Sequence, residues 1–245
     1  MKLTVLGYYG GYPYRGQATS GYLIQEQNFN LLLDCGSGVL NVLESFLDPL
    51  QLDAVLITHY HHDHTADLGV LQYYWQLKSG AKKQQFLPIY GHTQDPLHFA
   101  ALTLPQVSQG YPYSDLQSLN LGPFILTFLR TIHPVPAYAV RITSQRDHKT
   151  LVFTADTAYF NELITFAQGA DVLITDTNFP ADKSGQIWHM TSQQSGYLAQ
   201  QAQVQRLIIS HLPQEYSLDQ LLMEAQQAAG EVTTLRAHTG LKIVF

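Results

Sequence analysis

The most informative stretch of this 245-residue chain is His59-Tyr60-His61-His62-Asp63-His64. It places four histidines and one carboxylate within six residues, and imidazole and carboxylate are ligands that zinc, manganese and iron(II) accept. The preceding residues 54–58 form a short apolar run typical of a buried strand. The cluster is therefore predicted to follow the C-terminal end of a strand, where open α/β sheets place their sites. A metal would ligate histidines that would otherwise be desolvated side by side.

Three further short apolar runs also end at a potential metal ligand. They are residues 152–155 before Asp156, residues 172–175 before Asp176 and residues 207–210 before His211. Continuously apolar runs are buried on both faces, and parallel or mixed neighbours would bring the polar ends of all four runs to one edge of the sheet. A single such residue is equally well explained as a turn residue or a helix cap. Four in the same relation favour a metal site.

Composition limits the classes of partner. The net charge is -6 and no basic run occurs, so a large nucleic acid is not expected as a partner, whereas metal ions could still attract a small anionic substrate. Cys35 is the only cysteine, which excludes an internal disulfide and suits the cytoplasm. The start of the chain lacks signal-peptide features, and no apolar stretch approaches the ~18 residues of a membrane helix. We expect a cytoplasmic protein without a membrane segment.

The pattern of the whole chain predicts one α/β domain over residues 1–245. Strands are expected at 3–6, 22–25, 30–33, 54–58, 86–90, 124–131, 139–143, 151–154, 172–175, 207–210 and 241–245. Helices are expected at 39–47, 68–77, 96–104, 162–168, 194–203 and 218–228. A capping-box pattern at residues 191–194 precedes one of these helices. Residues 105–120 show no clear pattern and are expected to form a loop near the site.

Residues 58–64 match the H-x-H-x-D-H motif of the metallo-β-lactamase superfamily. Five further segments resemble its ribonuclease Z-like branch and stand in the expected order, namely 33–36, 133–136, 154–157, 188–191 and 210–212. The resemblance extends from Gly7 to the C-terminus. It implies an α/β fold of the four-layer αββα sandwich type, with two metal ions at one edge.

The resemblance also implies seven ligands for these ions. They are His59, His61 and His133 for the first ion, Asp63, His64 and His211 for the second, and Asp156 as a bridge to both, together with a water or hydroxide. Two ions about 3.5–4 Å apart can lower the pKa of a shared water and hold the attacking and leaving oxygens. Zinc is the default for imidazole-rich ligation, with manganese or iron(II) as alternatives.

Other residues near these motifs have candidate roles. The resemblance places His189 at the active site, where it is expected to bind or protonate the leaving group. Asp63 is expected to orient the nucleophile or accept its proton. Asp34 is either a turn or cap residue or a carboxylate that orients a ligand imidazole. Asp176 has the same two interpretations and is a rival to Asp156 for the bridging role, although Asp156 matches the family better.

The remaining histidines, tyrosines and the cysteine have weaker signals. His62 occupies the variable position of the motif and is expected to point away from the site. No ligand spacing relates the remaining histidines, which are interpreted as structural or surface residues: His92, His98, His148 and His238. The loop tyrosines either stack on substrate or pack, and they are Tyr8, Tyr9, Tyr12 and Tyr14. Cys35 is not expected to bind metal.

A phosphodiesterase is the preferred function. His133 and Asp156 are only 23 residues apart, too few for the tRNA-gripping arm of ribonuclease Z, so a small or nucleotide phosphodiester is expected as substrate. A lactone, thioester or β-lactam hydrolase is the alternative, and a non-catalytic metal-binding module is a weaker one. A flavodiiron-like redox site is disfavoured because those proteins usually have glutamate where His61 stands. A homodimer is expected by analogy with short ribonuclease Z-like proteins.

Overall fold

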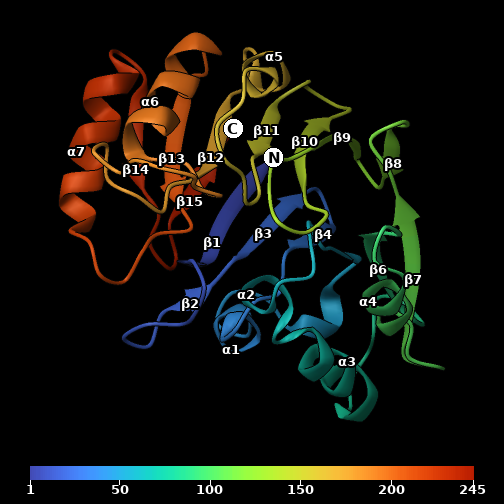
Figure 1. Cartoon of the computed structure of the whole chain (residues 1–245). Helices are drawn as coiled ribbons and strands as arrows, with labels where there is room; N and C mark the ends of the chain where they lie inside the picture. Colours follow the sequence, from blue (N-terminus) through green and yellow to red (C-terminus); the bar gives the residue numbers. More distant parts are fainter. The chain divides into compact units, whose positions relative to one another are not determined.

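The computed structural model describes all 245 residues and contains two sheets, each in a compact unit of its own. Unit 1 consists of Met1–Ser114 and His238–Phe245, and unit 2 consists of Asp115–Ala237. Both sheets mix parallel and antiparallel strands and are accompanied by helices (Figure 1), so the predicted α/β class is confirmed. The prediction of one domain across the whole chain stays a prediction.

The sheet of unit 1 has the strand order β15-β1-β3-β4-β5-β6-β7, with β2 paired to β1. Its strands are β1 (Lys2–Tyr9), β2 (Ala18–Thr19), β3 (Gly21–Glu26), β4 (Phe29–Leu33), β5 (Ala54–Leu56), β6 (Leu87–His92), β7 (Ser108–Tyr113) and β15 (Lys242–Val244). The strands from β4 to β7 are parallel. The helices of this unit are α1 (Val39–Leu43), η1 (Pro49–Gln51), α2 (His62–Thr65), α3 (Leu68–Leu77) and α4 (Pro96–Ala101).

Apolar side chains of α1 and α3 form the core of unit 1 together with its sheet. Leu71 and Trp75 of α3 and Leu43 of α1 belong to one buried cluster with Leu32 and Val55 of the central strands. Burial of one such side chain stabilises the fold by about 1.5–3 kcal/mol. The α3 helix thereby fixes the short segment between β5 and its own start, which is the histidine-rich stretch.

The sheet of unit 2 has the order β14-β13-β12-β11-β10-β9-β8. Its strands are β8 (Leu119–Leu121), β9 (Phe124–Arg130), β10 (Tyr138–Ser144), β11 (Thr150–Phe153), β12 (Val172–Asp176), β13 (Arg206–Ser210) and β14 (Thr233–Arg236). The helices are α5 (Glu162–Ala167), α6 (Ser192–Gln201) and α7 (Leu218–Ala229). The α6 and α7 helices lie side by side (Figure 1), and a Cβ on Gly196 would lie 2.2 Å from the carbonyl oxygen of Ala225. Only glycine permits this close approach.

Parallel pairing of β11, β12 and β13 confirms part of the expected strand-end arrangement. Asp176 is in register with Ser210, the residue before His211, and Asp156 follows β11 on the neighbouring strand. The prediction that residues 54–58 end at the same edge of the same sheet is wrong, because β5 belongs to the sheet of unit 1. An apolar run shows that a strand is buried but not which sheet it joins.

Most expected elements are present, with three corrections. Residues 105–120 are not a plain loop, since they contain β7 and the start of β8. The β7 strand lies at a sheet edge and includes Gly110 and Pro112, which hides its strand pattern because such residues are typical of turns. The helices expected at 39–47 and 96–104 end earlier, at Leu43 and Ala101. The capping box at Thr191 is confirmed and starts α6 at Ser192.

No helix of the structure combines the length and the apolar character that crossing a membrane requires.

Candidate metal centre

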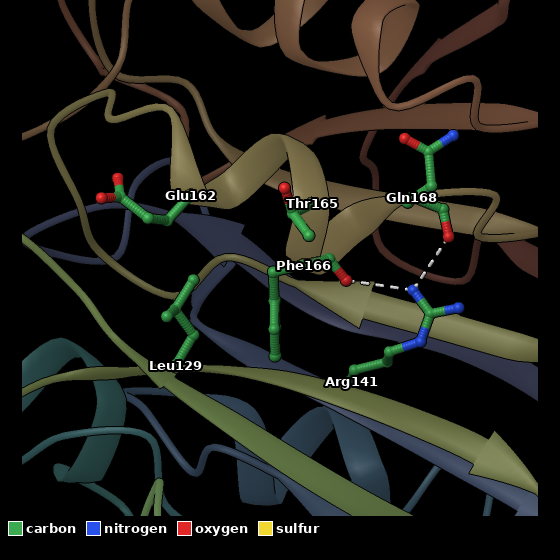
Figure 2. Close-up of a pocket in the computed structure, with 6 residues that line it drawn as sticks. All are labelled: Leu129, Arg141, Glu162, Thr165, Phe166 and Gln168. Carbon is green, nitrogen blue, oxygen red and sulfur yellow. Dashed lines mark hydrogen bonds between the residues drawn. The ribbon is translucent and has the colours of Figure 1, made fainter.

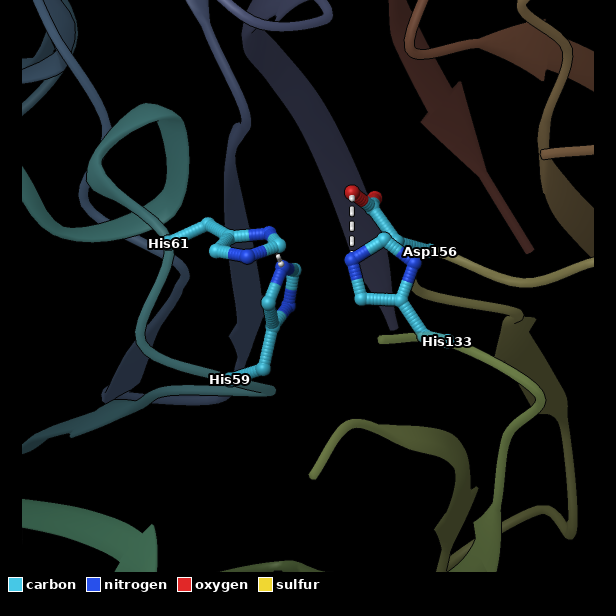
Figure 3. Close-up of side chains that lie close together, drawn as sticks. All are labelled: His59, His61, His133 and Asp156. Carbon is cyan, nitrogen blue, oxygen red and sulfur yellow. Dashed lines mark hydrogen bonds and ion pairs between the residues drawn. The ribbon is translucent and has the colours of Figure 1, made fainter. Parts of the chain in front are cut away.

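The histidine-rich stretch of unit 1 begins just after β5 and ends within the short helix α2. His59 and His64 are fully buried, whereas His62 is exposed, as expected. The Nε2 atom of His59 lies 3.2 Å from Nδ1 of His61 (Figure 3). The rings of His59 and His64 are 4.1 Å apart. Three imidazoles thus crowd together, and imidazole nitrogens gathered in this way suit a divalent cation.

Asp34 holds one of these imidazoles in place. Its Oδ2 atom lies 2.6 Å from Nδ1 of His64, and its carboxylate also accepts hydrogen bonds from the amide of Thr58 and the hydroxyl of Ser20. The α1 helix has Gly38 at its N-cap and no side-chain cap, so the cap interpretation of Asp34 is wrong and the orienting interpretation fits. A proton held on Nδ1 leaves Nε2 of His64 available as a ligand.

Asp63 has a backbone partner that no sequence pattern indicates. The amide of Gly11 donates to Oδ2 of Asp63 at 2.7 Å, and the same oxygen lies 3.6 Å from Nε2 of His64. The N-terminal glycine- and tyrosine-rich loop is therefore fixed to the carboxylate expected to act in catalysis. Side-chain identity does not encode a contact made by a peptide N–H, so the sequence could not predict it.

In unit 2, Asp156 lies between two histidines. Its Oδ1 atom is 3.3 Å from Nε2 of His211, and its Oδ2 atom is 3.8 Å from Nε2 of His133 (Figure 3). All three side chains are nearly inaccessible to solvent. Each oxygen of one carboxylate thus faces a different imidazole nitrogen, the arrangement expected of a bridging ligand.

Asp176 contacts the Nδ1 atoms of two histidines. Its Oδ1 atom lies 3.2 Å from Nδ1 of His211, and its Oδ2 atom lies 2.7 Å from Nδ1 of His189. The amide of Thr157 also donates to Oδ2. Ligand atoms of Asp156, Asp176, His189 and His211 all lie within 4.8 Å of one another. Because both oxygens of Asp176 face Nδ1 atoms, its position fits an orienting role better than a bridging role.

The neighbouring carboxylates also affect the titration of His189. Burial favours the neutral imidazole and lowers its pKa, but the carboxylates of Asp176 and Asp156 outweigh burial, and the net pKa of His189 is raised. Its ring stacks on that of His211 at 5.1 Å. Asp176 therefore fixes the orientation of His189 and favours its protonated form.

Four imidazoles at the site have one nitrogen held by a neighbour. Nδ1 of His59 lies 3.3 Å from the Thr58 hydroxyl, Nδ1 of His64 contacts Asp34, Nδ1 of His133 lies 3.4 Å from the Trp188 carbonyl oxygen, and Nδ1 of His211 contacts Asp176. Each partner selects the tautomer that leaves Nε2 as the possible metal ligand. This donor set of imidazole nitrogens and carboxylate oxygens fits zinc, manganese or iron(II).

Local contacts and burial explain other residues that the sequence singled out. His98 pairs with Asp95 at 2.7 Å, and Tyr8 and Tyr9 are buried, so packing explains these tyrosines. Burial raises the pKa of the Cys35 thiol well above its usual value. Burial therefore favours the protonated thiol, and the expectation that Cys35 does not bind metal stays a prediction.

A cavity of about 570 Å³ in unit 2 is lined by other residues, including Leu129, Arg141 and Phe166 (Figure 2). The Arg141 guanidinium donates to the carbonyl oxygens of Phe166 and Gln168 near the C-terminal end of α5. A cation at this position stabilises the helix end. The same carbonyls disfavour an anionic ligand beside Arg141, so we assign this arginine a structural role.

Comparison with known families agrees with this geometry. The model of the family described as "Beta-lactamase superfamily domain" matches residues 29–212. The chain belongs to the metallo-β-lactamase superfamily. Within this superfamily it is 45% identical over 240 residues to "Probable metallo-hydrolase YhfI" of Bacillus subtilis, covering 97% of this chain and 98% of the relative. The crystal structure of YhfI covers 99% of this chain and 98% of its own, with a TM-score of 0.93 and 42% identity.

Ribonuclease Z proteins are more distant relatives. The chain is 24% identical to ribonuclease Z of Thermoplasma acidophilum, over 91% of this chain and 90% of the relative. The short form of human tRNase Z shares the fold at 19% identity, covers 100% of this chain and 99% of its own, and has a TM-score of 0.76. The predicted metallo-β-lactamase fold and the resemblance to ribonuclease Z are therefore confirmed. The chain is a metal-dependent hydrolase with a cluster of histidines and aspartates.

Proposed function

We propose that this hydrolase is a phosphodiesterase that works with two divalent metal ions, zinc by default and manganese or iron(II) as alternatives. The observation that carries the proposal is Asp156, whose two oxygens face Nε2 atoms of different histidines. A ribonuclease cleaves phosphodiester bonds, so the relatives named ribonuclease Z support this bond type.

The assignment of ligands follows the motif match. We assign His59, His61 and His133 to the first ion, Asp63, His64 and His211 to the second, and Asp156 to both. When bound, the two ions would lower the pKa of a water molecule and neutralise negative charge on the phosphate oxygens in the transition state. The donor set fits this role because it consists of imidazoles and carboxylates.

The chain's own residues supply positioning and proton transfer. Asp63 is held by the Gly11 amide at 2.7 Å, so it can orient the nucleophile or accept its proton without moving. His189 is held by Asp176 and its pKa is raised. It is therefore suited to donate a proton to the leaving oxygen, because a protonated imidazole stabilises the departing alkoxide.

A small substrate fits the chain better than a tRNA. Between His133 and Asp156 the chain forms only a short connection and the β10–β11 hairpin, which leaves no arm to grip a large RNA. The net charge of -6 also disfavours a long polyanion. We propose a cyclic nucleotide, a short oligonucleotide or a similar small phosphodiester as substrate.

Hydrolysis of bis(p-nitrophenyl) phosphate by protein loaded with zinc or manganese tests the proposal. We expect metal-dependent release of p-nitrophenol that EDTA stops and that re-addition of metal restores. A lactone and a thioester substrate are assayed in parallel. Turnover of either, with none of the phosphodiester, would overturn the phosphodiesterase proposal in favour of carbonyl chemistry. No turnover of any substrate by fully metal-loaded protein would point to a non-catalytic role.

A further inference from the structure

The 178–191 loop, which joins β12 to α6, is irregular but firmly held. Three hydrogen bonds donated by backbone amides fix it, from Asn178 N to Met190 O at 3.1 Å, from Ser192 N to Phe179 O at 2.8 Å and from Ala181 N to the side-chain Oε2 of Glu224 on α7 at 2.9 Å. The amide group of Asn178 also donates to the carbonyl oxygen of His211. A loop without regular structure that is closed at its base in this way keeps its side chains in defined positions.

Trp188 of this loop stands between contacts to two histidines of the site. Its carbonyl oxygen lies 3.4 Å from Nδ1 of His133, and the next residue, His189, contacts Asp176 at 2.7 Å. The backbone of Trp188 is therefore fixed on both sides at the site. Its indole remains 39% exposed, whereas Trp75, the other tryptophan of the chain, is fully buried.

Exposure alone does not mark Trp188 as a binding residue. Single exposed hydrophobic side chains are common on protein surfaces. What distinguishes Trp188 is its backbone, which is fixed between His133 and His189, so that an exposed indole belongs to a residue at the site. The face of a tryptophan ring is also a flat, rigid surface on which any of the nucleobases can stack.

The exposed acidic and basic side chains of the loop cancel each other's charge. Asp182 and Lys183 are adjacent, exposed and opposite in sign, and the Lys183 ammonium lies 5.1 Å from the ring of Phe179. Phe179 in turn packs against His189. Aromatic surface is therefore the feature that the loop contributes to the site.

We propose that Trp188 is a specificity residue that stacks on the base of a nucleotide substrate. The inference rests on the proposed phosphodiesterase function and narrows its substrate class to phosphodiesters that carry a nucleobase. The base binds by stacking, while the phosphate lies near His189. A phosphodiester without an aromatic group would lack this contact and bind more weakly.

Tryptophan fluorescence gives a direct test, because Trp75 is buried and only Trp188 can contact a ligand. Adenosine 5′-monophosphate, as a product analogue, and ribose 5-phosphate, as its base-free counterpart, are titrated into the zinc-loaded protein. We expect the nucleotide to quench the emission and ribose 5-phosphate to leave it unchanged.

Variants separate stacking from a general effect of the loop. By calorimetry, we expect Trp188→Ala to raise the Kd for adenosine 5′-monophosphate about 5- to 100-fold and to leave the Kd for ribose 5-phosphate unchanged. Trp188→Phe keeps an aromatic face and should restore most of the affinity. Tyr111→Ala, which removes a comparably exposed aromatic ring from β7, is the matched control and should bind like the wild type.

Equal affinity for the two phosphates, or an unchanged Kd in Trp188→Ala, would overturn the inference. Thermal unfolding of each variant shows whether a loss reflects misfolding. Turnover of bis(p-nitrophenyl) phosphate without nucleotide-dependent quenching would refute the stacking role and leave the proposed function standing. Quenching without any phosphodiester turnover would refute the proposed function and leave the binding surface standing.

Discussion

Unit 1 and unit 2 carry the side chains that we propose as metal ligands in contrasting ways. In unit 1 they lie within six consecutive residues, from His59 to His64, which begin just after a short strand and end within a short helix. In unit 2 they follow separate strands or loops and are brought together by the sheet, as with Asp156 after β11 and His211 after β13. The contiguous set is visible in the sequence, whereas the dispersed set depends on how the strands of the sheet pair.

The same contrast applies to the carboxylates that orient the histidines. Asp34 in unit 1 contacts one imidazole, that of His64. Asp176 in unit 2 contacts two, those of His189 and His211. The dispersed site is therefore the more interdependent of the two, and substitutions in unit 2 should have the wider consequences.

The largest expected effect comes from the carboxylate at the centre of the dispersed site. Asp156→Ala should reduce phosphodiester turnover by about three orders of magnitude or more, because it removes the proposed bridge. Asp171→Ala is the matched control. Asp171 precedes β12, whereas Asp156 follows the parallel strand β11, and Asp171 pairs with Lys149. Steady-state kinetics on both variants checks this. Wild-type turnover in Asp156→Ala would refute the two-metal mechanism.

The two orienting carboxylates should differ in what they affect. Asp34→Asn should weaken zinc binding about 10- to 100-fold and leave kcat of the zinc-saturated protein near that of the wild type. Asp176→Asn should weaken zinc binding similarly and also lower kcat, because it releases His189 as well as His211.

Chelator competition measures the affinities, and kcat is measured at saturating zinc. If zinc-saturated Asp176→Asn retains the kcat of the wild type, the suggested link between Asp176 and proton transfer is wrong.

A smaller effect is expected from the backbone that directs Asp156. Ala155 is buried and has a positive φ of 50°, a conformation that side chains disfavour. Ala155→Val should lower the free energy of unfolding by about 1–3 kcal/mol, because a β-branched side chain fits this conformation poorly. Ala155→Gly should change it by less than about 1 kcal/mol. Urea denaturation compares the free energies of unfolding of the two variants. Equal values would contradict the inference that the backbone at Ala155 is strained.

The smallest effect should come from an ion pair remote from the ligands. Burial raises the pKa of Asp171, but the Lys149 ammonium and the Thr150 amide outweigh it, and the net pKa lies below the ordinary value of 3.8. A lowered folded-state pKa stabilises the protein above the unfolded value, and this stability is lost as the pH falls through the folded pKa.

Asp171→Asn should therefore be less stable than the wild type by about 1 kcal/mol or less at neutral pH. The difference should disappear as the pH falls below 3.8 towards the folded pKa. Denaturation curves at several pH values measure it, and a difference that grows in acid would have the wrong sign.

Elements with strong local signals were predictable from the sequence. The α3 helix occupies the predicted residues 68–77 because apolar residues recur at helical spacing, and Thr191 starts α6 through a capping box. The β7 strand was missed because an edge strand with Gly110 and Pro112 lacks an alternating pattern. The assignment of β5 to a different sheet from β11–β13 was also beyond the sequence, since strand pairing depends on the whole fold.

Residue types at the site were predictable, but their contacts were not. Asp34 and Asp176 each allowed a turn or an orienting interpretation, and only their distances to histidine nitrogens distinguish these. The Gly11 amide and the Trp188 carbonyl contact site residues through the backbone. Such contacts carry no side-chain signature, so they depend on the folded chain.

The most direct test of the central claim is the metal content of the purified protein. Inductively coupled plasma mass spectrometry, after the protein is loaded with zinc and excess metal is removed, should give two zinc ions per chain for the wild type. Asp156→Ala should retain markedly less, because the proposed bridge to both ions is lost. One ion or none in a folded wild-type protein, or two in Asp156→Ala, would contradict a dinuclear centre bridged by Asp156.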